Sequence, residues 1–64
     1  MNDTLDRIRR ELQAAHRGHR MAADAHALEA VKALRDNDYS AAAAACHRAE
    51  LQQLCANAMD RWVQ

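Results

Sequence analysis

Four histidines lie within the 64 residues of this chain, and imidazole is the side chain that most readily combines metal binding with proton transfer near neutral pH. Two of them lie in the segment His16-Arg17-Gly18-His19-Arg20, together with two arginines and the only glycine. This segment could bind a metal through its imidazoles, contact phosphates through its guanidiniums, or bend at the glycine. The choice depends on which faces of the fold these side chains occupy.

The other two histidines each begin a His-x-x-Glu segment, from His26 to Glu29 and from His47 to Glu50. In an antiparallel helical hairpin these segments would meet as crossed pairs, with His26 facing Glu50 and His47 facing Glu29. Two interpretations are open: the imidazoles donate to the carboxylates and fix the helix register, or the four side chains bind a transition metal. A wrong register would separate the four residues, and we therefore assign no metal ligand and no cofactor.

Cys46 and Cys55 lie in one predicted helix, where their spacing separates the Cα atoms by roughly 13 Å, beyond the ~7 Å limit for a disulfide. We expect free thiols, as is typical of a reducing, cytoplasmic compartment. Cys55 could approach His19 and His16, a set that suits zinc. Nucleophilic catalysis also requires a base and oxyanion-binding donors, and no glycine-rich loop accompanies Ser40 or either thiol. The sequence therefore predicts that the protein is not an enzyme.

Helix-forming residues occupy almost the whole chain, which contains no proline. The one cluster of turn-forming residues is Asp36-Asn37-Asp38-Tyr39-Ser40. Asn37 can adopt the left-handed conformation that ends a helix, and Asp38 can cap the next one. The sequence predicts an all-α, single-domain, two-helix antiparallel hairpin, with helices over about residues 3–35 and 39–63.

Helical spacing gathers apolar residues on one face of each predicted helix. The first face comprises Leu5, Ile8, Leu12, Ala15, His19, Ala23, His26, Ala30 and Leu34. The second comprises Ala44, His47, Leu51, Leu54, Cys55, Ala58 and Trp62. A short turn makes the helices neighbours with these two faces in contact, and paired residue numbers then add up to roughly 76.

In this register the aliphatic residues at the start of the first helix, Leu5, Ile8 and Leu12, have no counterpart on the second helix. Either another chain covers them, or the first helix bends near Gly18 and the protein is a three-helix bundle. We favour another chain, because a glycine inside a helix costs only ~1 kcal/mol and no turn-forming residues accompany Gly18.

Further apolar residues support an intermolecular interface. Met21, Leu28 and Val31 lie away from the main apolar face of the first helix, and Trp62 lies near the end of the second. Half of the residues are hydrophobic, but sixteen are alanine, so a single chain has few large side chains with which to build a core. The predicted assembly is a homodimeric four-helix bundle, with these residues and the first-helix aliphatics at a dimer or partner interface.

Arg10, Gln13, Arg17 and Arg20 recur at helical spacing beside the apolar face. In size and hairpin architecture the chain resembles the Rop-type plasmid regulators, and that resemblance implies nucleic-acid binding by these residues as an alternative function. Nine basic and nine acidic residues balance over the chain, which argues against a strongly nucleic-acid-binding surface.

We expect a small protein-binding module, such as an adaptor, co-chaperone, inhibitor or regulator, that acts through apolar helix faces. Nucleic-acid binding and metal binding by His/Glu or His/Cys sets are the alternatives. Charged residues alternate with aliphatic ones near the N-terminus, unlike a signal peptide, and no apolar run approaches membrane-spanning length. The predicted location is therefore cytoplasmic, with a second copy and another protein as partners and no membrane contact.

Overall fold

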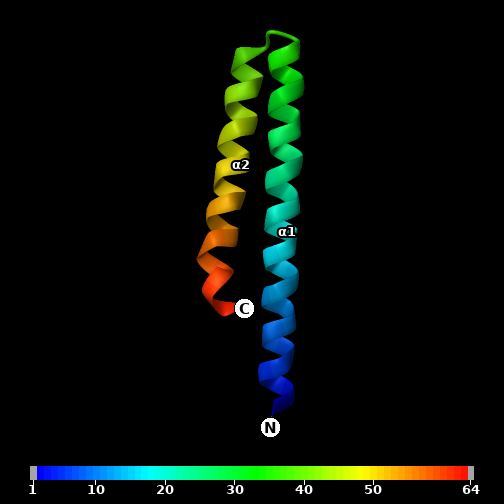
Figure 1. Ribbon diagram of the computed structural model, residues 1–64, viewed down its shortest axis with the longest axis vertical. Coiled ribbons are helices and arrows are strands. Elements are labelled where there is room, and N and C mark those ends of the chain that lie inside the picture. Colours follow the sequence, from blue (N-terminus) through cyan, green and yellow to red (C-terminus); the bar gives the residue numbers. More distant parts are fainter. Residues whose placement is uncertain (1, 64) are drawn as a thin grey trace.

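Two long helices joined by a tight turn make up the computed structural model, which describes residues 2–63 (Figure 1). Helix α1 spans Asn2–Arg35, α2 spans Tyr39–Met59, and the short 3-10 helix η1 spans Asp60–Trp62. The helices run antiparallel and pack along their length, so the predicted all-α hairpin is confirmed. The Cα positions extend over 55 × 14 × 13 Å.

The turn uses the residues that the sequence predicted. Asn37 has a φ of 57°, the left-handed conformation that asparagine tolerates better than most residues. The N–H of Asp38 donates to the Ala33 carbonyl at 2.9 Å, which closes the end of α1. The Asp38 carboxylate accepts a hydrogen bond from the Ala41 N–H at 3.1 Å and caps α2.

We expect Asp38→Ala to lower the free energy of unfolding by about 1 kcal/mol, because the substitution removes the side-chain cap of α2. Asp36→Ala is the matched control, since the Asp36 side chain makes no hydrogen bond among the described residues. Thermal and urea unfolding followed by circular dichroism measure both variants. Equal destabilisation by the two substitutions would contradict the capping role of Asp38.

Helix α1 continues through Gly18 without interruption, and the three-helix alternative is therefore wrong. Gly18 has no positive φ, so its backbone does not use the conformational freedom that a bend would require. One glycine lowers the stability of a helix only slightly. An unbroken α1 offsets this loss because it brings Ala23 and Ala30 into contact with α2.

Alanines form the core of the hairpin. Among residues 2–63, the buried apolar residues are Ala23 and Ala30 on α1 and Ala42, Ala45 and Ala56 on α2. Among the described residues, no large side chain is fully buried. On α1, the inward side matches the predicted face from Leu12 to Ala30, whose members are buried or half-buried.

The predicted face of α2 is wrong. Its seven predicted members are all exposed, and the side that packs on α1 comprises Ala42, Ala45, Ala49, Gln52, Ala56, Met59 and Val63. Helix α2 has apolar residues on every side, so hydrophobic spacing alone does not single out one face. The prediction gave most weight to large side chains, whereas the folded hairpin packs small ones inward and turns Leu51 and Leu54 outward.

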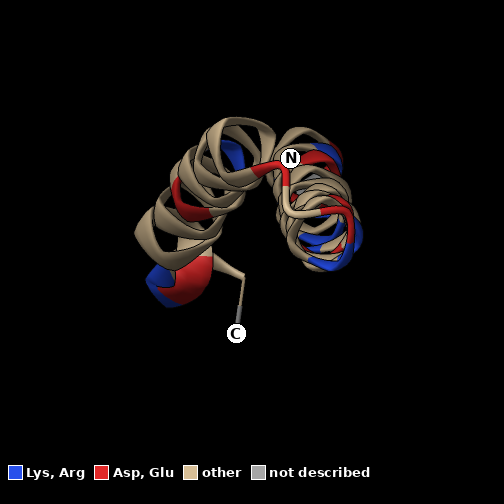
Figure 2. Ribbon diagram, turned by 90° about the horizontal axis from the view of Figure 1, so that it is seen from above, with Lys and Arg blue, Asp and Glu red and all other residues tan. Residues whose placement is uncertain are grey.

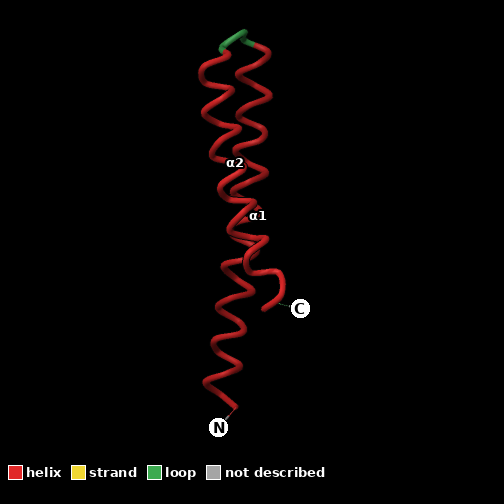
Figure 3. Tube along the Cα trace, turned by 90° about the vertical axis from the view of Figure 1, so that its left-hand side faces the viewer, coloured by secondary structure: helices red, strands yellow, loops and turns green. Residues whose placement is uncertain are grey.

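Charges are distributed unevenly between the two helices. Figure 2 shows acidic and basic residues along α1, whereas α2 is largely uncharged until the chain reaches Asp60 and Arg61. Figure 3 shows that α1 extends well beyond η1 at its N-terminal end. Leu5 and Ile8 are exposed on this overhang, as predicted, while Leu12 is half-buried. Within residues 2–63, neither helix combines the length and the apolar character that a membrane-spanning segment requires.

Candidate functional site

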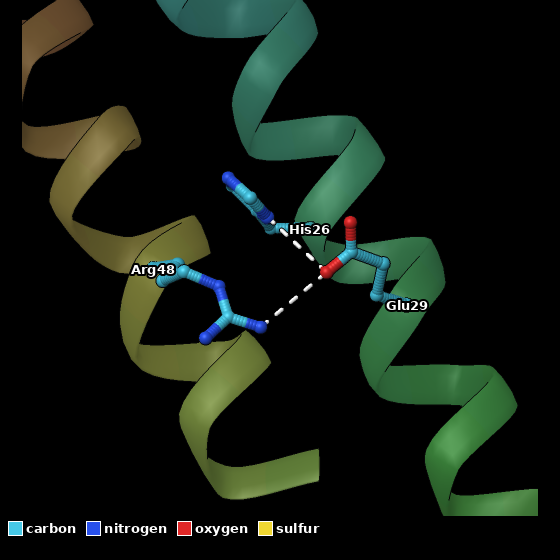
Figure 4. Close-up of polar contacts among 3 residues, drawn as sticks. All are labelled: His26, Glu29 and Arg48. Carbon is cyan, nitrogen blue, oxygen red and sulfur yellow. Dashed lines mark hydrogen bonds and ion pairs between the residues drawn. The ribbon is translucent and has the colours of Figure 1, made fainter. Parts of the chain in front are cut away.

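The predicted crossed layer of histidines and glutamates does not form. His26 Nδ1 lies 3.4 Å from Glu29 Oε2 on its own helix, and the same oxygen accepts from Arg48 Nη2 on α2 at 3.4 Å (Figure 4). His47 is exposed, and Glu50 lies with Asp24 along a groove on another side of the hairpin. The register itself is close to the predicted one, but the rotation of α2 places Arg48, not His47, opposite Glu29.

The contacts of Glu29 lower its pKa from the ordinary value. The main cause is the hydrogen bond from His26; desolvation acts in the opposite direction, and the hydrogen bond from Arg48 and the positive charges of His26 and Arg48 lower the pKa further. Both donors favour the ionised carboxylate. The side chains of Glu29 and Arg48 are about half exposed, so water and salt weaken this ion pair and its role is mainly to orient the helices.

This lowered pKa gives a pH dependence with a definite sign. Ionised Glu29 contributes stability above its unfolded pKa of about 4.5, and that contribution disappears as the pH falls through the lower folded pKa. We expect the thermal midpoint of Glu29→Gln to lie below that of the wild type at about pH 6, and the difference to shrink as the pH falls below about 4.5. A difference that persists at low pH would contradict this assignment.

His16 and His19 each form a hydrogen bond with a residue of the second half of the hairpin, and the sequence analysis identified neither partner. His16 Nε2 donates to Asp60 Oδ1 at 2.6 Å, and His19 Nδ1 donates to Gln52 Oε1 at 2.6 Å. The His16 side chain is 13% exposed, so its partner is necessary to satisfy a nearly buried polar group. The first pair could have been found from the predicted register, since the residue numbers fit it.

We expect His16→Ala and Asp60→Ala each to destabilise the hairpin, and the double variant to lose little more than either single one. A double-mutant cycle measured by urea unfolding should give a coupling of about 0.5–1.5 kcal/mol for this hydrogen bond. Strictly additive effects would show that the two side chains do not interact in solution.

The sets proposed for zinc are also separated. Cys46 and Cys55 are exposed free thiols, and His19 bonds to Gln52 instead of approaching Cys55. Over residues 2–63, no three side chains of His, Cys, Asp or Glu lie close enough together to hold a metal ion. The histidines near the core therefore have a structural explanation, which is polar pairing between the helices.

A continuous surface lies on the side of α1 that faces away from α2, and we call it the α1 outer face. Met21 and Leu28 are 71% and 55% exposed there, and Val31 is also exposed. Exposed charged residues at matching helical spacing complete this face: Arg10, Arg17, Asp24 and Arg35. Arg20 is exposed next to it, whereas Gln13 is half-buried. Thus the predicted apolar and arginine residues belong largely to one surface.

The exposed side of α2 carries the residues that the sequence analysis had placed in the core. Leu54 and Trp62 are 63% and 64% exposed, and Leu51 is exposed as well. The Arg61 guanidinium lies over the Trp62 ring at 5.5 Å from its centroid, a cation–π contact that covers part of the indole. These side chains make a second apolar surface, separate from the α1 outer face.

Comparison of the chain with models of protein families, with curated proteins and with solved structures gave no match. The chemistry of the two exposed surfaces is therefore the basis on which a function can be argued.

Proposed function

We propose that this chain is a small protein-binding module that captures an amphipathic, acidic helix on the α1 outer face. The observation that carries the proposal is the exposure of Met21 and Leu28 on the side of α1 turned away from its own partner helix. These side chains contribute nothing to the hairpin core, so their burial is available to a binding partner.

The spacing of the apolar residues fits a helical partner. Met21, Leu28 and Val31 lie seven and three residues apart, which places them on one seam of about three turns along α1. A helix that lies along this seam would contribute its own apolar residues at i, i+3 and i+7 positions. Long flexible side chains such as methionine adapt to partner surfaces of irregular shape.

The charges next to this seam indicate which partner helix fits. Arg10 and Arg17 precede the apolar seam and Arg35 follows it, and among the described residues none of the three forms an ion pair within the chain. Asp24 is an acid on the face next to the apolar seam, and Asp3 lies at the same seven-residue spacing on the overhang beside Arg10. A partner with glutamates or aspartates beside its apolar seam would complement these guanidiniums, which favours correct orientation and fast association more than raw affinity.

Such a surface supports the role of an adaptor, co-chaperone or inhibitor, each of which acts by covering or presenting a helix of another protein. The net charge of zero and the apolar centre of the face favour a protein over nucleic acid, because phosphate binding depends on an excess of positive charge. Nucleic-acid binding by Arg10, Arg17 and Arg20 is the competing outcome of the same experiment.

The test uses a synthetic helical peptide with leucines at i, i+3 and i+7 spacing and glutamates on both sides of that seam. We expect the protein to bind this peptide, and Leu28→Asp to weaken binding at least about tenfold, since it places a charge in the apolar seam and repels the glutamates. Isothermal titration calorimetry measures the affinities.

Two controls make the result specific. Ala43→Asp introduces the same charge at an exposed site on α2 and should leave binding unchanged, and a peptide with lysines in place of glutamates should bind poorly. Equal binding of both peptides would contradict the proposed chemistry. Tighter binding to a double-stranded RNA or DNA fragment, lost in Arg17→Ala and at high salt, would establish the nucleic-acid alternative instead.

A further inference from the structure

The hairpin exposes more surface than a compact protein of its mass. Its accessible area is 5091 Å², whereas a compact monomer of 7.2 kDa exposes about 4,100 Å². The excess, about 1,000 Å², is similar to the ~800 Å² that each partner buries in a stable interface of standard size. One additional interface per chain would therefore bring the exposed area to that of a compact protein.

The nature of the core indicates that this interface belongs to a second copy. The buried apolar residues in the described part of the chain are five alanines, and an alanine side chain contributes little burial energy when it folds inward. A chain of this length with such a core depends on association for its stability. A second copy is present whenever the chain folds and at the same concentration, so it can supply this stabilisation without any other molecule.

One side of the hairpin is suited to this role, and the Glu29–Arg48 contact marks its position. On α2, residues at helical spacing from Arg48 share this side, and on α1, residues at helical spacing from Glu29 share it. We call it the Glu29–Arg48 side; its other members are Ala44, Leu51, Cys55, Ala58 and Trp62 from α2 and Glu11, Ala15, Gly18, Ala22 and Ala25 from α1, with Glu11 on the overhang beyond the end of α2. A row that contains the large side chains Leu51 and Trp62 thus lies next to a row of small ones.

The opposite side of the hairpin is polar. A shallow groove there is lined by Ala23, Asp24, Ala27, Ala49, Glu50 and Gln53. Gln53 donates a hydrogen bond to Asn57 at 2.9 Å on the same side. Two carboxylates and two amides would lose water if this side formed an interface, which carries a desolvation cost, so this side favours contact with solvent.

The geometry points to a homodimer in which two copies meet through their Glu29–Arg48 sides, with the two-fold axis parallel to the hairpins. Helix α2 of each copy then lies along α1 of the other copy. Rotation about this axis keeps the height of every residue, so each α2 residue is level with the same α1 position in the second copy as in its own chain. Leu51 would pack over Ala25 of the second copy, and Trp62 over its Ala15. Large side chains meet small ones in both helix pairs, which keeps the spacing of the four helices even.

The other two-fold arrangement, with the axis across the hairpins, fits less well. It would place α2 against α2 and α1 against α1, so that large residues meet large ones and Gly18 and the alanines meet one another. It would also direct the two overhangs to opposite ends. With the axis parallel to the hairpins, both overhangs lie at one end, where Leu5 and Ile8 of both copies face the bundle axis. The same arrangement brings Arg48 level with Glu29 of the second copy, which matches opposite charges.

The first test is the mass of the full chain in solution. We expect sedimentation equilibrium to give twice the chain mass of 7.2 kDa, and Leu51→Asp to weaken the dimer at least tenfold. Leu54→Asp is the matched control, because Leu54 is exposed outside the Glu29–Arg48 side. If Leu51→Asp unfolds the chain while Leu54→Asp does not, the result also supports the dimer, since Leu51 is exposed in a single hairpin.

A second variant tests the small-residue row. A Cβ built on Gly18 meets no atom within 4 Å in the single hairpin, so Gly18→Leu should raise the helicity and the thermal midpoint of a monomer. In the proposed dimer the added side chain would displace Ala58 of the second copy, and we expect at least tenfold weaker association. The proposal would be overturned if the unmodified chain were fully helical and had the mass of one chain at roughly 100 µM.

Cross-linking tests the orientation. In a Cys46→Ser, Ala22→Cys variant, mild oxidation should give a product with the mass of two chains, in which peptide mapping finds position 22 joined to Cys55; the mass separates this link from one within a single chain. A dimer joined only through Cys55 of both copies would overturn the parallel axis. This interface is separate from the α1 outer face: Leu28→Asp should keep the dimer mass while losing the peptide, so either proposal can fail alone.

Discussion

The alanine seam between α1 and α2 is the constraint on which the rest of the structure depends. Ala30 on one helix and Ala42 and Ala45 on the other have no side chain beyond Cβ, so the two backbones can approach closely near the turn. Close approach leaves no space for leucine or tryptophan between the helices. The large apolar side chains are consequently displaced to the outside, where Met21, Leu28, Leu51, Leu54 and Trp62 are exposed.

Polar pairing determines the rotation of α2 where the alanines end. A nearly buried imidazole must find a hydrogen-bond partner, and His16 and His19 find theirs in Asp60 and Gln52. If α2 were rotated to place Leu51 and Leu54 inward, both imidazoles would lose these bonds and remain partly buried without a partner, which offsets the extra apolar burial. Small residues thus permit the close packing, and histidines select one of the orientations that it allows.

Much of the fold could be predicted from the sequence because its signals are local. The Asn37-Asp38 turn, the continuity of α1 through Gly18 and the overhang of Leu5 and Ile8 follow from backbone preferences and helix lengths alone. The inward face of α2 could not be predicted in the same way, since an alanine run such as 41–45 has no polar side and every rotation buries similar residues. Recognising that Asp60 falls opposite His16 in the predicted register would have given the rotation, because a nearly buried histidine needs a partner.

The two proposed surfaces have different consequences for function because they lie on different sides of the hairpin. In a dimer built through the Glu29–Arg48 sides, each α1 outer face remains at the surface, and the two-fold axis parallel to the helices directs the two faces away from each other. One captured helix therefore cannot touch both, so each dimer offers two independent sites instead of one clamp. If the partner has a single helix, two partner molecules would bind to one dimer independently. If the partner has two copies of the helix, it would link one dimer to another. This geometry favours an adaptor, which connects partners, over an inhibitor that encloses one helix.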